Sequence, residues 1–282
     1  MPRSSHRTPR SSRRPRKRHA PCHLFSLLVL GLIVALSLPA NAAQGTTVIR
    51  AQSTGTAAQT HSLASRVLAE GTAYATPYYD NDSGIAGPTV VVVGGMHGNE
   101  PAGYTAAAKF ATLMPRRGRL IVIPEANTLA VKAGTRTGSH PGDLNRDFPT
   151  SKSGKTGSVL AESIWKLLRE VDPDYLFDLH EGYDFHKLNK ESVGQSIIYY
   201  PTGDAASMAK AMQSEVNRTI TNKNHRFSLL KYPIKGSLAR AAGMVLGTKA
   251  MIIETSRKQA FETRVEQHVT MVRAALRKLQ ML

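Results

Sequence analysis

The chain has 282 residues and a formal net charge of +17, with 41% hydrophobic and 20% charged residues. This length allows one sizeable core, and Cys22 is the only cysteine, so a small scaffold stapled by disulfides is excluded. Much of the basic excess lies in residues 1–19, which hold no acidic residue.

Residues 1–42 have the pattern of an export leader. The basic segment is followed by an apolar run over 24–38 and by Ala40 and Ala42 at an Ala-x-Ala spacing. This order predicts a signal peptide cleaved after Ala42, and hence an exported protein that is periplasmic, cell-wall or secreted. The run is shorter than the about 20 residues of a membrane span. An uncleaved anchor is the alternative, and only then is membrane contact expected. Export is favoured over a nucleic-acid-binding arm, so no nucleic acid is expected.

Residues 43–62 are small and polar, which predicts a spacer before a folded domain over 63–282. Short β-branched or apolar runs in this domain predict strands, and apolar residues at helical spacing predict helices. The predicted strands cover 89–95, 119–127, 175–180, 196–201 and 249–256. The predicted helices cover 101–113, 157–171, 204–220, 236–245 and 259–280. The alternation predicts an α/β fold with three layers, α/β/α, around a mostly parallel, mixed central sheet.

Ionisable residues stand where several of these strands end. His97 and Glu100 follow the first predicted strand, His180 ends the strand over 175–180, and Glu254 ends the apolar part of the strand over 249–256. Parallel sheets bind ligands beyond the carboxyl ends of their strands, so these side chains are expected to meet at one edge. Asn145 and Arg146 lie on the long loop after the second strand and are expected at the same edge.

Two histidines and a glutamate suit a catalytic zinc ion, because three protein ligands leave the fourth position open for water. We therefore expect one zinc per chain, held by His97, Glu100 and His180, and a water whose pKa falls toward about 7. Glu254 is the expected general base, which passes the proton to a leaving amine. Arg136 and Arg146 are expected to bind a substrate carboxylate, or one of them polarises the scissile carbonyl. Taken singly, each residue has a plainer alternative, such as a strand-end histidine or a loop charge.

Five segments, "GGMHGNEPAG", "NTLAVKAGTR", "DLNRDFP", "DLHEG" and "IIETS", resemble the succinylglutamate desuccinylase/aspartoacylase family, within the zinc carboxypeptidase-like hydrolases. The resemblance implies the same zinc ligands and the same catalytic glutamate. It further implies substrate-binding roles for Arg136, Asn145 and Arg146. Asp143 matches an acid that hydrogen-bonds a ligand histidine and so fixes its tautomer. Tyr232 matches the mobile tyrosine of carboxypeptidases, with an ordinary core or surface tyrosine as the alternative.

These observations predict an exported zinc hydrolase of the deacylase type, which cleaves an amide bond next to a carboxylate. Aspartoacylases carry a C-terminal domain, whereas only a short segment follows Glu254 here. Together with export, this keeps open a metallocarboxypeptidase acting on peptides or peptidoglycan stem peptides. The expected partner is a small molecule or peptide bearing a carboxylate, with cell-wall material as a further possibility. A non-catalytic protein that binds an anionic polymer is the alternative from another class.

Overall fold

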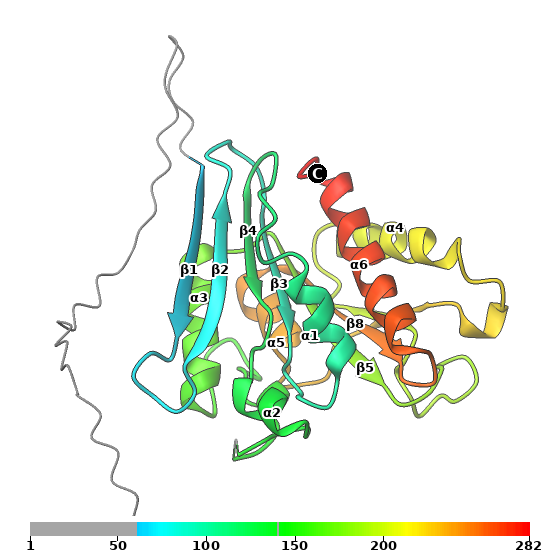
Figure 1. Ribbon diagram of the computed structural model, residues 1–282, viewed down its shortest axis with the longest axis horizontal. Helices are drawn as coiled ribbons and strands as arrows, with labels where there is room; N and C mark the ends of the chain where they lie inside the picture. Colours follow the sequence, from blue (N-terminus) through cyan, green and yellow to red (C-terminus); the bar gives the residue numbers. More distant parts are fainter. Residues whose placement is uncertain (1–60, 140) are drawn as a thin grey trace, which may run out of the picture. The chain divides into compact units, whose positions relative to one another are not determined.

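A computed structural model describes residues 61–139 and 141–282, so the predicted leader and nearly all of the predicted spacer lie outside the described part. One eight-stranded sheet has the strand order β1-β2-β4-β3-β5-β8-β6-β7 (Figure 1). Its strands are β1 Ser62–Leu68, β2 Thr76–Asp82, β3 Thr89–Gly94, β4 Arg119–Ile123, β5 Tyr175–Gly182, β6 Ser196–Tyr199, β7 Ser228–Lys231 and β8 Lys249–Ser256. The four neighbours β4, β3, β5 and β8 run parallel, whereas β2 and β6 run antiparallel to the strands beside them in this group.

Helices cover both faces of the sheet, which confirms the predicted three-layer α/β/α class (Figure 1). The helices are α1 Pro101–Ala108, α2 Thr128–Ala133, α3 Val159–Val171, α4 Ala205–Asn217, α5 Leu238–Ala241 and α6 Phe261–Lys278. Apolar side chains of α1, α4 and α6 form one core layer with the sheet, and those of α3 and α5 form the other. Strand β3 shows why: Val90 and Val92 enter the first layer and Val91 and Val93 the second, so a continuous apolar run is buried on both sides.

The structure adds strands that the sequence pattern did not predict, namely β1, β2 and β7. Strand β1 is largely exposed, and β2 buries the polar residues Asp80 and Asn81, so neither follows an apolar pattern. Asp80 is instead held by two short hydrogen bonds from the Arg119 guanidinium, each 2.7 Å long. The predicted helix over 101–113 ends at Ala108, because the residues that follow form turns whose backbone hydrogen bonds join residues three apart.

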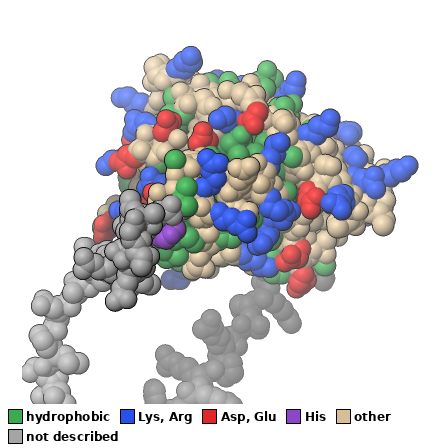
Figure 2. Space-filling view, turned by 90° about the horizontal axis from the view of Figure 1, so that it is seen from above, with side chains coloured by type: hydrophobic (Ala, Val, Ile, Leu, Met, Phe, Trp, Pro, Cys, Tyr) green, Lys and Arg blue, Asp and Glu red, His purple; other side chains and the backbone are tan. Residues whose placement is uncertain are grey.

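The two edges of the parallel strands are separate surfaces. Strand pairing aligns Ser62 with Asp82, Asp82 with Arg119 and Arg119 with Thr89. The chain thus enters the domain at the edge where the parallel strands begin, and the predicted ligands lie at the other edge. Figure 2, seen from above the view of Figure 1, shows many Lys and Arg side chains on this face, with Asp and Glu side chains among them. Among the described residues, no helix combines the length and apolar character that a membrane crossing requires.

Candidate metal centre

The loop after β3 places two of the predicted ligands. Gly95 has a φ of +70°, a left-handed conformation that favours glycine. At Gly98 an added Cβ would overlap the Ala130 carbonyl of α2, so the loop can pass α2 only with glycine there. The chain then turns back through a hydrogen bond from the Glu100 N–H to the His97 carbonyl (3.3 Å), and Glu100 becomes the N-cap residue of α1. His97 and Glu100 therefore point to the same side of the loop.

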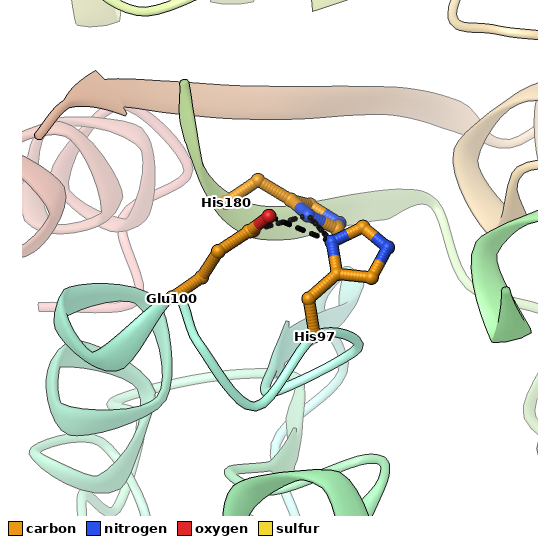
Figure 3. Close-up of side chains that lie close together, drawn as sticks. All are labelled: His97, Glu100 and His180. Carbon is orange, nitrogen blue, oxygen red and sulfur yellow. Dashed lines mark hydrogen bonds and ion pairs between the residues drawn. The ribbon is translucent and has the colours of Figure 1, made fainter. Parts of the chain in front are cut away.

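The third predicted ligand comes from the end of β5 and meets the other two (Figure 3). His97 Nδ1 lies 2.8 Å from Glu100 Oε1, and His180 Nδ1 lies 2.8 Å from Glu100 Oε2. The two Nδ1 atoms are 3.2 Å apart. One ligand atom from each residue lies within 4.8 Å of the others, and all three side chains are buried. This is the only group of at least three His, Cys, Asp or Glu side chains with such spacing in the described part of the chain.

A carboxylate stands behind each imidazole. Asp143 Oδ1 lies 2.9 Å from Nε2 of His97, and Asp178 Oδ1 lies 3.1 Å from Nε2 of His180. A carboxylate at Nε2 favours the tautomer with its proton on that nitrogen, which leaves Nδ1 with a free lone pair. Both rings therefore present Nδ1 to the shared point. Asp178 was not among the predicted site residues, although its position two residues before His180 on one strand places both on the same face.

The negative groups control protonation in this cluster. Burial acts to lower the pKa of His97, but hydrogen bonds to Asp143 and Glu100 outweigh it and raise the pKa. For His180, burial again acts to lower the pKa, while Asp178 and Glu100 raise it well above its usual value. Burial acts to raise the pKa of Glu100, yet the two histidines hold it far below its usual range. The electrostatic potential of these carboxylates therefore favours a positive charge at the centre of the cluster.

These residues fit a zinc ion by donor chemistry and by charge. Two imidazole nitrogens and one carboxylate form the His₂Glu set of catalytic zinc sites. Tetrahedral bonds of about 2.0–2.2 Å require ligand atoms roughly 3.3–3.6 Å apart. The separations of 2.8, 2.8 and 3.2 Å found here are slightly shorter, so the side chains need to move apart only a little to hold the ion. Asp178 is fully buried, and His180 Nε2, 3.1 Å from Oδ1, is the one polar partner found for its carboxylate among the described residues. A divalent cation would balance the negative charge that this carboxylate adds.

Glu254 lies at the end of β8, in register with His180 of β5. Its side chain faces the cluster and keeps a small exposed fraction, 8%. Burial raises the pKa of Glu254 to about 7, with a further rise from Glu100 and an opposing effect from His180. A carboxyl group with a pKa near neutrality can both accept and return a proton at physiological pH.

The predicted substrate-binding residues lie around the same centre. Arg136 donates through Nε and Nη2 to Asp143 Oδ2 (3.2 and 2.8 Å), and its Nη1 lies 3.4 Å from Glu100 Oε1. Asn145 Nδ2 lies 3.3 Å from His180 Nε2, and Arg146 donates to the Asn145 carbonyl at 2.7 Å. Arg146 and Arg136 are each more than a third exposed, so their guanidinium groups remain accessible to a ligand.

Tyr232 is a surface residue just after β7, with 55% of its surface exposed and a φ of +64°. Its N–H donates to the carbonyl of Tyr199, which pairs with Met251 of β8, so it is not brought level with Glu254. Its ring lies 4.9 Å from the guanidinium of Arg240, which also lies 5.4 Å from the ring of Tyr200. Arg240 was not predicted as a site residue, because nothing in its local sequence distinguishes it. Only the fold brings its charge to the Tyr232 loop.

Replacing Asp178 by asparagine is expected to weaken zinc binding by about ten- to a hundred-fold, the range for groups that orient a metal ligand. Stability measured with a chelator present should change little, because asparagine keeps the size of the side chain and removes a buried charge whose one contact is with His180. Zinc competition titrations and urea unfolding test both parts. Asp172→Asn is the matched control. Asp172 is exposed and has a left-handed backbone conformation, which asparagine also tolerates. Unchanged zinc affinity in Asp178→Asn would contradict the assigned role.

His268 of α6 provides a pH prediction. Burial, helped by the nearby His180 charge, lowers its pKa from 6.5 to about 3. The folded protein therefore keeps His268 neutral, whereas the unfolded chain binds a proton below pH 6.5. The free energy of unfolding should fall by about 1.4 kcal/mol for each pH unit from 6.5 down to about 3. Urea unfolding between pH 7 and 4 should show a flatter dependence in His268→Gln than in the unsubstituted protein. Parallel curves would contradict the prediction.

Comparison with solved structures defines the class of fold. The cell shape determinant protein Csd4 of Helicobacter pylori, described as a D,L-carboxypeptidase, matches with a TM-score of 0.58 and 18% identity. The match covers 70% of this chain and 52% of Csd4. An aspartoacylase family protein from Mesorhizobium loti matches with a TM-score of 0.57 and 25% identity, over 79% of this chain and 68% of that one. The fold is thus of the zinc-carboxypeptidase-like type, as predicted.

A sequence model of the succinylglutamate desuccinylase/aspartoacylase catalytic domain matches residues 86–274. The chain belongs to this family, and the resemblance drawn from its motifs is confirmed. The N-alpha-acetyl-L-2,4-diaminobutyric acid deacetylase of Halomonas elongata is 37% identical over 100 residues, which are 34% of this chain and 29% of the deacetylase. The matched regions therefore span less than a third of that deacetylase and about half of Csd4.

Proposed function

We propose that this protein is a zinc-dependent hydrolase of the deacylase type, which cleaves an amide bond adjacent to a carboxylate. The observation that carries the proposal is the convergence of two imidazole Nδ1 atoms and the Glu100 carboxylate, with Glu254 facing the same point. Family membership and the likeness to a deacetylase support the reaction type. The family also supports an enzyme rather than a non-catalytic polymer-binding protein.

His97, Glu100 and His180 would hold the zinc ion. When bound, zinc activates water near neutral pH and polarises a carbonyl group. Glu254 takes a proton from the attacking water as the water oxygen bonds to the amide carbon. The same carboxyl group then gives the proton to the amide nitrogen as the carbon–nitrogen bond breaks, so one residue serves as base and acid.

Arg136, Asn145 and Arg146 orient the substrate through its carboxylate. A guanidinium group matches a carboxylate through two parallel hydrogen bonds, and the amide of Asn145 supplies a further donor. Arg136 already bonds the Asp143 carboxylate, so it is held in place for this contact or for one with the scissile carbonyl. Tyr232, which matches the mobile tyrosine of carboxypeptidases, would contact the outer part of the substrate.

A metallocarboxypeptidase is the second candidate, and one feature of the loop after β7 favours it. Tyr232 and Ile234 are both more than half exposed on this loop, which leads to Leu238, whose N–H donates to Asn145 Oδ1. Exposed apolar side chains of this kind suit a peptide longer than an acylated amino acid. A peptidoglycan stem peptide fits this candidate.

The leader pattern of residues 1–42 supports export, with 63–282 as the catalytic domain, and mass spectrometry of the secreted protein would test cleavage after Ala42.

A substrate panel tests the proposal. Purified protein loaded with zinc is assayed on N-acetylated amino acids and on peptides with a free C-terminal carboxylate, each beside a form whose carboxylate is blocked as an amide. The deacylase proposal predicts turnover of the acetylated amino acids and loss of turnover on blocking. Preferential turnover of peptides would establish the carboxypeptidase candidate instead. Equal turnover of blocked and free substrates would contradict the carboxylate-binding role of the arginines.

A further inference from the structure

A buried ion pair lies behind the metal centre, on the other face of the sheet. Successive side chains of a strand point to opposite faces, so His180 faces the centre while Glu181 faces α1 and α6. Arg264 of α6 donates from Nη1 to Glu181 Oε1 at 2.6 Å. The Glu181 side chain is fully buried and the Arg264 side chain is 12% exposed. This pair connects the end of β5 to the helix that covers it.

The backbone of Glu181 contacts a predicted zinc ligand directly. Its N–H donates to Glu100 Oε2 at 3.1 Å, the same oxygen that lies 2.8 Å from His180 Nδ1. Glu100 caps α1, whereas His180 belongs to β5, so the two ligands come from different elements. The peptide between His180 and Glu181 therefore fixes where one ligand lies relative to the other. Any tilt of that peptide would move the Nδ1 atom and the carboxylate apart.

The side chain of Glu181 is placed to hold this peptide. It lies beside the first turn of α1, near the Ala102 N–H, and the Arg264 guanidinium donates to it from α6. On the neighbouring strand β8, Thr255 lies opposite Glu181, and its Oγ1 lies 3.2 Å from Nε2 of His268, one turn after Arg264 on α6. Helix α6 thus anchors the ends of both strands that carry site residues.

Stabilisation of the fold does not by itself explain why this ion pair is buried. Burying two charges costs several kcal/mol for each ion, and apolar replacements of buried pairs are often neutral or stabilising. The pair is also incompletely bonded, because Arg264 Nε has no hydrogen-bond partner among the described residues. A group retained only for stability would be expected to have its donors satisfied.

We propose that Arg264 and Glu181 are positioning residues, which hold the His180–Glu181 peptide so that Glu100 and His180 are set at the spacing a zinc ion requires. The inference rests on the proposed function, because it concerns the same metal centre. It assigns the two residues no contact with substrate.

Three variants test the inference, namely Arg264→Met, Glu181→Met and the double variant that carries both changes. The zinc dissociation constant is measured by chelator competition, and stability by urea unfolding with excess chelator. Each single variant leaves one buried polar group without its partner and should lose stability. The double variant removes both charges together, so its stability should return toward that of the unsubstituted protein. Its zinc affinity should stay about ten- to a hundred-fold weaker.

The outcomes separate the possibilities. A double variant that binds zinc as tightly as the unsubstituted protein would overturn the inference, because the pair would then only neutralise charge. If the double variant does not fold, Arg264→Lys replaces it, with weaker zinc affinity as the expected result and unchanged affinity as the contrary one. Glu266→Gln is the control, since it breaks an exposed α1–α6 ion pair with Lys109 and should leave zinc affinity unchanged. Absence of zinc binding by the unsubstituted protein would instead overturn the proposed function itself.

Discussion

Replacing Glu254 by glutamine should lower kcat by about a thousand-fold while zinc stays bound. Glutamine keeps the size of the side chain but can neither take a proton from water nor return one, and a positioned acid or base contributes about 10²–10⁴ in rate. The effect should fall on kcat rather than on KM, because Glu254 is not assigned to substrate binding.

The measurement is steady-state kinetics on the best substrate of the panel, combined with metal analysis of the same preparation. Glu125→Gln is the matched control, since Glu125 is an exposed glutamate on the loop after β4 and should tolerate the change. A Glu254→Gln protein with near-normal kcat would mean that another group moves the proton.

Substituting His97 by alanine should remove both zinc and activity. One of three ligand atoms is lost, and Glu100 and Asp143 each lose a partner at 2.8 or 2.9 Å. Zinc affinity should fall by more than about a hundred-fold, the upper range for residues that only support a ligand. Metal content after dialysis against a chelator, measured beside His186→Ala, tests this. His186 is a suitable control because its ring bonds the Ser192 carbonyl, outside the cluster. Full activity in a metal-free preparation would refute the zinc mechanism.

The central strands and the meeting of the ligands could be predicted from sequence for the same physical reason. Strands such as β3 are buried on both faces, so the run "TVVVV" has no other stable environment, and polar residues directly after such runs must lie at the sheet edge. The edge strand β1 and its neighbour β2 were not predicted, because their stability comes from strand pairing and from the Asp80–Arg119 contact, which leave no local sequence pattern.

The supporting residues around the centre were harder to predict. Asp178 could have been found from its spacing of two residues to His180 on a buried strand, since that spacing repeats a face. The Glu181–Arg264 pair joins residues 83 positions apart, and the sequence offers no sign of that contact. The catalytic and substrate-binding roles of Glu254, Arg136, Asn145, Arg146 and Tyr232 remain predictions that the variants and the substrate panel address.

The direction of β1 has a practical consequence for handling this protein. Because Ser62 aligns with the beginnings of the parallel strands, whatever is joined ahead of residue 61 attaches on the far side from His97 and His180. A resin or carrier joined directly at residue 61 would therefore attach to the face of the domain opposite the candidate metal centre.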